Sequence, residues 1–289
     1  MEISTNPQSE AFDTIRWYHY AVASPLRLLA SSQIGPLGGE NSISAVIEGV
    51  LALQRGEQID FELSKTDRFF VAQLTKSGIP DSMTEYRELN HLVQEEVIRR
   101  RRSGRMGVIW LGAGVFTQLH PLLGRRQAED WHVWTDKHPK VFRHAYHIFE
   151  EMQQRGDEHH ISFEITLPEQ IDRLNDWIRV MSSQIDQLVI SAYGLFYALT
   201  PAENKAWLSR LKLPVGMPVS FTVNSPGSAI TFLPGVMAAF HRQRMVYYDH
   251  AHIEAIFAET VPGSRVAWAR LRPHTRNNLW GTWLVERPV

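Results

Sequence analysis

The pattern of apolar and polar positions changes near residue 105. Before that point, apolar residues recur every three or four positions, which is the period of an amphipathic helix. Helices are therefore expected over 16–32, 41–56 and 82–102, the first interrupted near Pro25. The third segment begins with Ser82 and Glu85 at the spacing of a capping box, which predicts that Ser82 is its N-cap.

After residue 105, short apolar runs alternate with amphipathic segments. Seven runs are expected to form strands: 107–111, 131–136, 160–165, 187–193, 218–224, 265–271 and 282–288. Helical patterns fill two of the intervals, over 169–184 and 201–212. Such alternation predicts an α/β fold with an open, mostly parallel sheet. We therefore predict a helical N-terminal lobe, 1–105, and a Rossmann-like domain with a seven-stranded sheet, 106–289.

The first expected strand ends on Gly112, Ala113 and Gly114. In an open α/β sheet, ligands bind beyond the carboxyl ends of the strands, where bare backbone allows close approach. Asp136 ends the next strand, about 20 residues downstream, where a carboxylate can accept hydrogen bonds from ribose hydroxyls. The third glycine of the dinucleotide motif is replaced by Thr117, which favours S-adenosylmethionine, a cofactor without a pyrophosphate.

Three segments in order resemble the leucine carboxyl methyltransferase branch of the class I methyltransferases: IWLGAGVFTQLHPL, TDKHPKVFRHA and VISAYGLFYALTPAENKAWLSRL. The resemblance implies that the sheet binds S-adenosylmethionine and that the N-terminal lobe forms a lid. It also implies the cofactor-binding residues. Gly112, Ala113 and Gly114 line the methionine part, Thr117 begins the next helix, Asp136 holds the ribose, and Glu164 and Ile165 lie beside adenine.

The sequence departs from that branch where the family has Glu-Gly, because this chain has Tyr193-Gly194. A phenol ring can stabilise the sulfonium by a cation–π interaction of about 2 kcal/mol, or it can pack in the core. With an ordinary pKa of about 10, it is a poor general base near neutral pH. Tyr193, Tyr197 and Asn224, which ends a strand, are the catalytic candidates.

Three functions remain open on this evidence. The leading one is methyl transfer to a small molecule, at a carboxylate or another oxygen or nitrogen acceptor. The alternative is cyclisation of S-adenosylmethionine itself to azetidine-2-carboxylate and methylthioadenosine, as in relatives with this kind of fold. The third is a non-catalytic binding module that retains the cofactor pocket.

Two further groups of residues are candidates for substrate contact. Trp17, Tyr18 and Tyr20 are candidate lid residues, with core packing as the alternative. Asp249, His250, His252 and Glu254 are metal-ligand types. His250 and Glu254 would share one face of a helix, and His250, His252 and Glu254 one face of a strand. The sequence identifies no further ligand that converges with them, so no metal is expected. His250 is instead a candidate for contact with the substrate.

Composition excludes several classes. The chain has no cysteine, which removes disulfides and thiolate chemistry. The formal net charge of -1 gives no reason to expect nucleic acid, and the basic run 99–105 also suits the negative end of a helix. No apolar run approaches the roughly 20 residues of a membrane helix, and the polar start is not a signal peptide. We expect a cytoplasmic protein that acts on a small molecule; the oligomeric state is left open.

Overall fold

A computed structural model describes residues 12–13, 15, 18–24, 49–50, 52–54, 56, 58–59, 63, 65–77, 80–112, 122, 125, 127, 129–136, 158–162, 164–226, 244–275 and 278–289. Its main element is a seven-stranded sheet in the order β4-β3-β2-β5-β6-β9-β8. The strands are β2 (Met106–Leu111), β3 (Trp131–Asp136), β4 (Glu158–Ser162), β5 (Gln187–Ser191), β6 (Val219–Ser225), β8 (Arg265–Thr275) and β9 (Asn278–Arg287).

The sheet confirms the predicted open α/β class. Strands β2 to β6 are all parallel to one another, whereas β9 runs antiparallel to both β6 and β8. All seven predicted runs contribute strands. The prediction over 160–165 was wrong in its bounds, because β4 begins at Glu158 and ends at Ser162. Glu164 and Ile165 therefore follow the strand.

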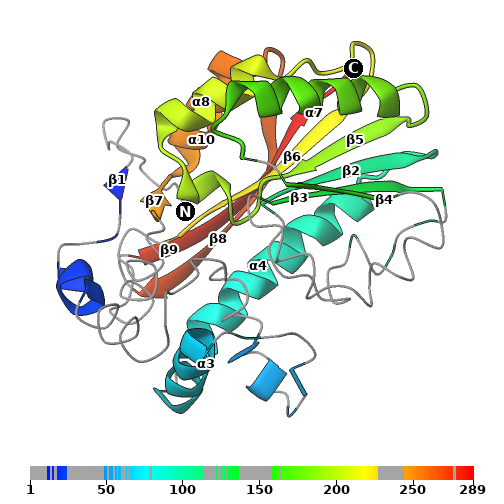
Figure 1. Ribbon diagram of the computed structural model, residues 1–289. Coiled ribbons are helices and arrows are strands. Elements are labelled where there is room, and N and C mark those ends of the chain that lie inside the picture. The colour runs from blue at the N-terminus through cyan, green and yellow to red at the C-terminus, as the bar shows by residue number, and fades with distance from the viewer. Residues whose placement is uncertain are drawn as a thin grey trace.

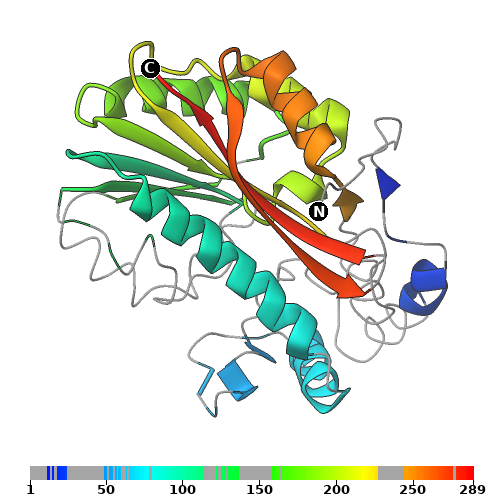
Figure 2. The same cartoon turned by 180° about the vertical axis from the view of Figure 1, so that it is seen from behind.

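Helices cover both faces of this sheet (Figures 1 and 2). On one face lie α7 (Pro168–Met181), α8 (Pro201–Arg210) and α10 (His250–Thr260), and on the other lies α4 (Pro80–Arg99). Alternate side chains of a strand point to opposite faces. Phe221 and Val223 accordingly belong to different core layers from Trp110, which packs with Val93 of α4. Both layers are apolar, as expected for parallel strands buried on both sides.

Helix α4 extends from the sheet to α3 (Lys65–Ser77) (Figure 1). It begins at Pro80, so Ser82 lies inside the helix and the prediction that it is the N-cap was wrong. Proline suits the first helical position because its missing N–H would have no intrahelical partner there. The C-terminal half of α4 packs on the sheet through Val93 and Val97. The boundary at residue 105 between an N-terminal lobe and a Rossmann-like domain stays a prediction.

The basic run at the end of α4 is held by acidic partners. Arg99 and Arg100 both donate to Glu96. Arg101 donates two hydrogen bonds to the carboxylate of Asp130, at 2.6 and 2.5 Å. Asp130 precedes β3, so this ion pair anchors α4 at the amino edge of the sheet, opposite the edge where ligands bind in such folds.

A second, two-stranded sheet joins β1 (Phe12–Asp13) to β7 (Val246–Tyr247), with Phe12 opposite Tyr247. Strand β7 packs beside η2 (Phe196–Ala198), the short helix that follows β5. Residues 12 and 13 are thereby held near the carboxyl edge of the main sheet. None of the helices described here combines the length and the apolar character that crossing a membrane requires.

Candidate functional site

The strand order places a topological switch point between β2 and β5. From β2 the chain adds β3 and then β4 on one side, and it returns to add β5 and β6 on the other side of β2. Connections therefore leave the carboxyl ends of β2 and β5 in opposite directions, which opens a crevice between them. Ligands of open α/β sheets bind at such a point.

Gly112 directly follows β2 at this crevice. Its φ of +60° lies in the left-handed region, which favours glycine. A Cβ added there would lie 3.2 Å from Cβ of Leu195, in the turn after β5. The missing side chain of Gly112 thus leaves room for Leu195, and it lets the end of β2 approach the β5 turn closely at the crevice. Ala113, Gly114 and Thr117 lie outside the described residues.

Asp136 is the last residue of β3 and is 6% exposed. Leu111 pairs with Thr135, so the next residues of the two strands, Gly112 and Asp136, are neighbours at the same edge. A carboxylate so deeply buried needs hydrogen-bond donors around it. The predicted contact of this carboxylate with ribose hydroxyls stays a prediction.

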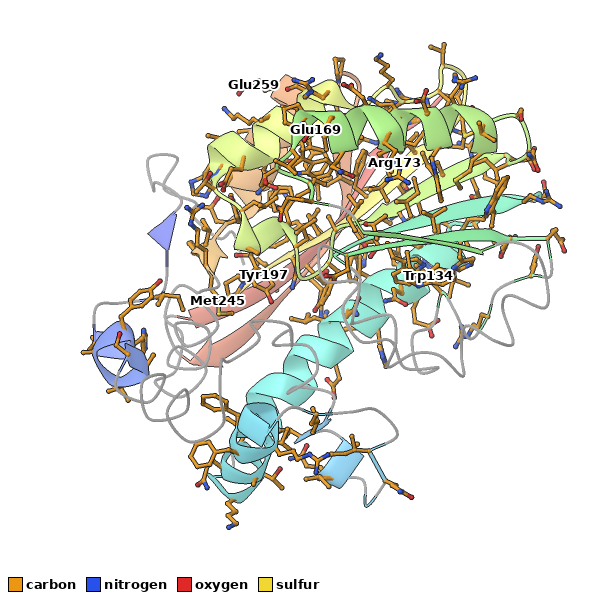
Figure 3. The ribbon with its side chains drawn as sticks, in the orientation of Figure 1. Trp134, Glu169, Arg173, Tyr197, Met245 and Glu259 are labelled. Carbon is orange, nitrogen blue, oxygen red and sulfur yellow. The ribbon has the colours of Figure 1, made fainter. Side chains whose placement is uncertain are left out.

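The three catalytic candidates come from adjoining elements at this edge. Tyr193 lies in the turn after β5, Tyr197 in η2, and Asn224 near the end of β6. The turn is tied to β6, because the N–H of Gly194 donates to Oδ1 of Asn224 at 2.9 Å. Figure 3 marks Tyr197 and Met245, which precedes β7.

Tyr193 keeps some exposed surface but packs at the rim of the core layer under α4. Burial raises the pKa of its phenol well above the ordinary 10.0, and the nearby Tyr197 raises it further. The Asn224 amide and the backbone of Asn90 act in the opposite direction but do not outweigh burial. The phenol is therefore neutral at physiological pH and is not a general base.

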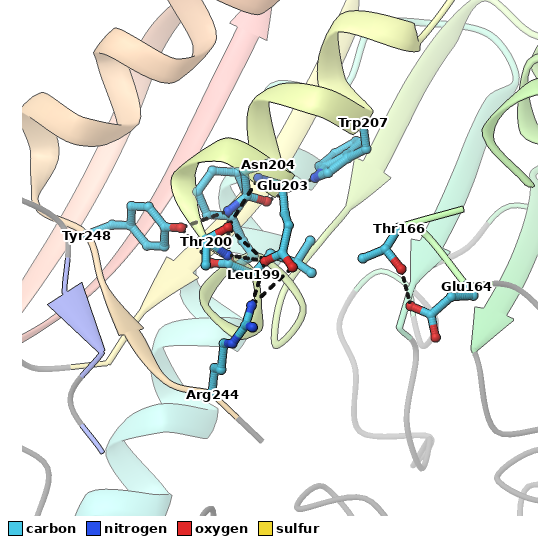
Figure 4. Close-up of polar contacts among 10 residues, drawn as sticks. Glu164, Thr166, Leu199, Thr200, Glu203, Asn204, Trp207, Arg244 and Tyr248 are labelled. Atoms are coloured by element: carbon cyan, nitrogen blue, oxygen red, sulfur yellow. Dashed lines mark hydrogen bonds and ion pairs between the residues drawn. The ribbon is translucent and has the colours of Figure 1, made fainter. Parts of the chain in front are cut away.

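Glu164 and Ile165 have different surroundings. Glu164 is in the loop that leads to α7 and accepts a hydrogen bond from Thr166 Oγ1 at 2.9 Å (Figure 4). Ile165 is 4% exposed and packs in the core layer that includes α7. Its burial has a structural explanation, and the predicted place of this pair beside adenine stays a prediction.

A charged cluster at the start of α8 was not predicted from the sequence. Glu203 accepts hydrogen bonds from Thr200 N and Oγ1, at 2.7 and 2.8 Å, and from Arg244 (Figure 4). Burial alone would raise the pKa of Glu203, but the bonds from Thr200 and then Arg244 lower it. The Thr-x-x-Glu spacing was a usable signal of this capping box, whereas nothing local indicates Arg244.

A buried network fixes the backbone around Tyr197. Asn204 is 0% exposed and donates through Nδ2 to the carbonyl of Phe196 at 2.8 Å and to the Tyr248 hydroxyl at 3.0 Å. The Tyr248 hydroxyl in turn donates to the carbonyl of Leu199 at 2.6 Å. Because these bonds satisfy the carbonyls of the η2 turn, Tyr197 is presented from a rigid support.

His250, the candidate substrate contact, has partners at both ring nitrogens. Nδ1 accepts from Trp283 Nε1 at 3.1 Å, and Nε2 lies 3.3 Å from a Glu254 oxygen. Asp249 and His252 form the capping box of α10. Within the described part of the chain, no group of three or more metal-ligating side chains comes together. Substrate contact at His250 would therefore require one of these bonds to be exchanged.

The candidate lid residues Tyr18 and Tyr20 are each 40% exposed on the helical segment 18–24. His19, between them, is 0% exposed and makes the buried contact of this turn. Trp17 lies outside the described residues. The two tyrosines thus face away from the buried side, and a lid role stays a prediction.

Comparison with known proteins gives a likeness of fold. No family model matches the chain, and no curated protein sequence does. A Thermobifida fusca YX protein, provisionally assigned as a methyltransferase, is 16% identical with a TM-score of 0.58, over 89% of this chain and 99% of its own. A DUF574-family protein from Streptomyces avermitilis is 13% identical with a TM-score of 0.58, over 86% and 98%.

The chain has the class I methyltransferase fold. The predicted fold class is thereby confirmed. At these identities the likeness extends to architecture alone, so the leucine carboxyl branch and the cyclising relatives remain resemblances of sequence. The chemistry must be argued from the residues at the carboxyl edge.

Proposed function

We propose that this protein binds S-adenosylmethionine at the carboxyl edge of its sheet and transfers the methyl group to a small molecule. One observation carries the proposal: left-handed Gly112 and buried Asp136 lie side by side at the switch point. The first lets the ends of β2 and β5 approach closely at the crevice, and the second offers a carboxylate to a ribose. Together they match the needs of a nucleoside cofactor.

The residues present fit S-adenosylmethionine. Gly112, with Ala113 and Gly114 after it, would hold the methionine part, and Asp136 would hold the ribose hydroxyls. Tyr193 would lie beside the sulfonium, where a ring face attracts a cation. When bound, the cofactor supplies an electrophilic methyl group on a positively charged sulfur.

The neutral phenol of Tyr193 limits the acceptor. Transfer to an alcohol or a phenol usually needs a general base, and a raised pKa makes Tyr193 unsuitable for that task. An acceptor that is already anionic needs none. Its oxygen lone pair forms the new bond to the methyl carbon while the carbon–sulfur electrons return to sulfur. No proton has to move.

The test is calorimetry with S-adenosylhomocysteine. Wild-type protein should bind it, and Asp136→Ala should weaken binding at least tenfold because the ribose loses its acceptor. Asp176→Ala is the matched control, since that carboxylate is exposed on α7, with its side chain 73% accessible. No binding of S-adenosylhomocysteine or S-adenosylmethionine at millimolar concentration would refute the proposal. Equal affinity of Asp136→Ala and wild type would refute the ribose assignment.

Cyclisation of the cofactor is the second candidate, and the tyrosine at a position where the resembling family has an acid favours it. In that reaction the amino nitrogen of the methionine part displaces the thioether, and methylthioadenosine leaves. Incubation with S-adenosylmethionine and no acceptor separates the two. Methyl transfer predicts no turnover beyond spontaneous decay, whereas cyclisation predicts enzyme-dependent methylthioadenosine and azetidine-2-carboxylate. A binding module without catalysis predicts neither product with any acceptor.

A further inference from the structure

Gln94 is a buried amide on the side of α4 that packs against the sheet. It is 0% exposed and follows Val93, which belongs to the apolar layer between α4 and the strands. Taking an amide out of water is unfavourable unless its polar atoms are hydrogen-bonded. An apolar side chain would fill the same space without that disadvantage. The partners of the Gln94 amide therefore indicate what it contributes.

One partner of Gln94 belongs to the connection that leaves β2. Oε1 of Gln94 accepts a hydrogen bond from the backbone N–H of Leu122 at 3.1 Å. Leu122 is 1% exposed and lies in the chain between Gly112 and β3. Its N–H is buried, and a buried N–H without an acceptor destabilises the fold. Gln94 thus holds the chain that follows Gly112 against α4.

The other partner of Gln94 leads to the turn after β5. Nε2 of Gln94 donates to Oδ1 of Asn90, one helical turn earlier on α4, at 2.9 Å. The backbone of Asn90 lies close enough to the Tyr193 phenol to favour its ionisation, although burial outweighs that effect and keeps the pKa raised. Tyr193 also packs against the apolar layer that contains Leu122. The turn of α4 from Asn90 to Gln94 therefore borders both connections.

These two connections flank the crevice at the switch point. The connection after β2 begins at Gly112, and the one after β5 contains Tyr193. Helix α4 is a third segment, and its backbone hydrogen bonds keep Asn90 and Gln94 at a fixed spacing. A rigid helix that contacts both connections sets how far apart they lie.

We propose that Gln94 is a positioning residue of the cofactor site, which fixes the connection after β2 relative to Tyr193. This inference rests on the proposed binding of S-adenosylmethionine and adds a residue that acts through Leu122 and Asn90, without contact to the cofactor. Binding sites depend on such supporting hydrogen bonds because the residues that touch the ligand must be held in place.

The first test is calorimetry with S-adenosylhomocysteine on Gln94→Met and Asn175→Leu. Methionine is about as long as glutamine but loses both hydrogen bonds. Asn175 of α7 is the matched control, because its Nδ2 donates to the Arg210 carbonyl and its Oδ1 accepts from the Lys212 N–H, which precedes β6. Both variants should lower the melting temperature. Gln94→Met alone should weaken binding, by roughly tenfold, because its site is no longer held in the productive geometry.

The second test observes Tyr193 without any ligand. Protein labelled with 3-fluorotyrosine gives a fluorine resonance for Tyr193, which is assigned by its absence from Tyr193→Phe. This resonance should shift in Gln94→Met and keep its position in Asn175→Leu, because only the first change releases the turn of α4 beside the phenol. If Gln94→Met does not fold, Asn90→Ala, which removes the acceptor of Gln94 Nε2, is measured by calorimetry with the same expected loss.

Three outcomes overturn the inference. Equal affinity of wild type and folded Gln94→Met would show that the site does not depend on this amide. Equal losses of affinity in Gln94→Met and Asn175→Leu would reduce the effect to general stability. An unmoved Tyr193 resonance in Gln94→Met would break the link between the two connections. Failure of the wild type to bind S-adenosylhomocysteine is the separate failure of the proposed function, and the fluorine experiment still tests the link.

Discussion

Replacement of Asp130 by alanine tests the ion pair that anchors α4 to the sheet. The Asp130 side chain is 0% exposed and that of Arg101 only 10%. The carboxylate also accepts the N–H of Met106 at 3.1 Å and that of Gln127 at 2.9 Å. Its loss leaves two N–H groups without their acceptor and removes the counter-charge of the guanidinium, which among the described residues keeps only the Gly104 carbonyl and Gln127 Oε1 as acceptors. Breaking a buried pair in this way costs about 3–5 kcal/mol.

The assay is urea unfolding followed by circular dichroism, with thermal unfolding beside it. At roughly 2–4 °C per kcal/mol, Asp130→Ala should lower the melting temperature by about 6–20 °C. Asp172→Ala is the control, because Asp172 is 60% exposed and lies 3.7 Å from Arg210, itself exposed. That variant should stay within about 0.5 kcal/mol of wild type. Equal losses in the two variants would refute the reasoning.

The difference in the free energy of unfolding between wild type and Asp130→Ala should also depend on pH. Burial alone would raise the pKa of Asp130, but bonds from Arg101, Gln127 and Met106 outweigh it and lower the pKa below the ordinary 3.8. A carboxyl group with a lowered pKa in the folded state stabilises the fold fully above its unfolded pKa. The stability gap between wild type and Asp130→Ala should thus be constant above about pH 5 and shrink as the pH falls below 4. A gap that widens on acidification would contradict this.

Two further predictions concern the carboxyl edge. Gly112→Ala should lower the free energy of unfolding by about 1–2 kcal/mol because of its left-handed conformation, and by more because the added Cβ contacts Leu195. The same variant should weaken S-adenosylhomocysteine binding in calorimetry. Gly216→Ala, at φ +74° with no atom within 4 Å of the added Cβ, is the control and should lose stability without losing affinity. Burial raises the pKa of Tyr193. The ultraviolet difference titration between wild type and Tyr193→Phe should therefore stay flat through about pH 10, where an ordinary phenol is half ionised. Half-ionisation of Tyr193 at that pH would contradict its buried environment.

The interior strands were predictable because burial on both faces forces apolar runs. The run 131–136 became β3 with the predicted bounds. The predicted bounds of the edge strand β4 were wrong for two reasons. The strand includes Glu158 and two histidines, polar residues that an edge strand tolerates. The apolar Ile165 lies outside the strand and packs in the core layer that includes α7. The predicted start of α4 was wrong because the helix begins at Pro80, two residues before the capping-box spacing of Ser82 and Glu85.

The positions of the candidate residues were predictable where the signal is local. The places of Gly112 and Asp136 at strand ends follow from the apolar runs before them; their roles stay predictions. The bond from Gly194 to Asn224 and the ion pair between Glu203 and Arg244 join residues that are 30 and 41 positions apart. No period or motif encodes such pairs, because they depend on which strands become neighbours and on how the loops return.

The pairing of β1 with β7 has a consequence for how this chain is made. Phe12 is synthesised before every strand of the main sheet, and its partner Tyr247 is synthesised after β2 to β6. Closing so long a loop is entropically costly, and contacts between distant residues form late. During synthesis the N-terminal segment must therefore wait, unpaired, while β2 to β6 assemble. A nascent chain arrested before residue 246 should expose segment 12–13 to proteases, and the completed chain should protect it.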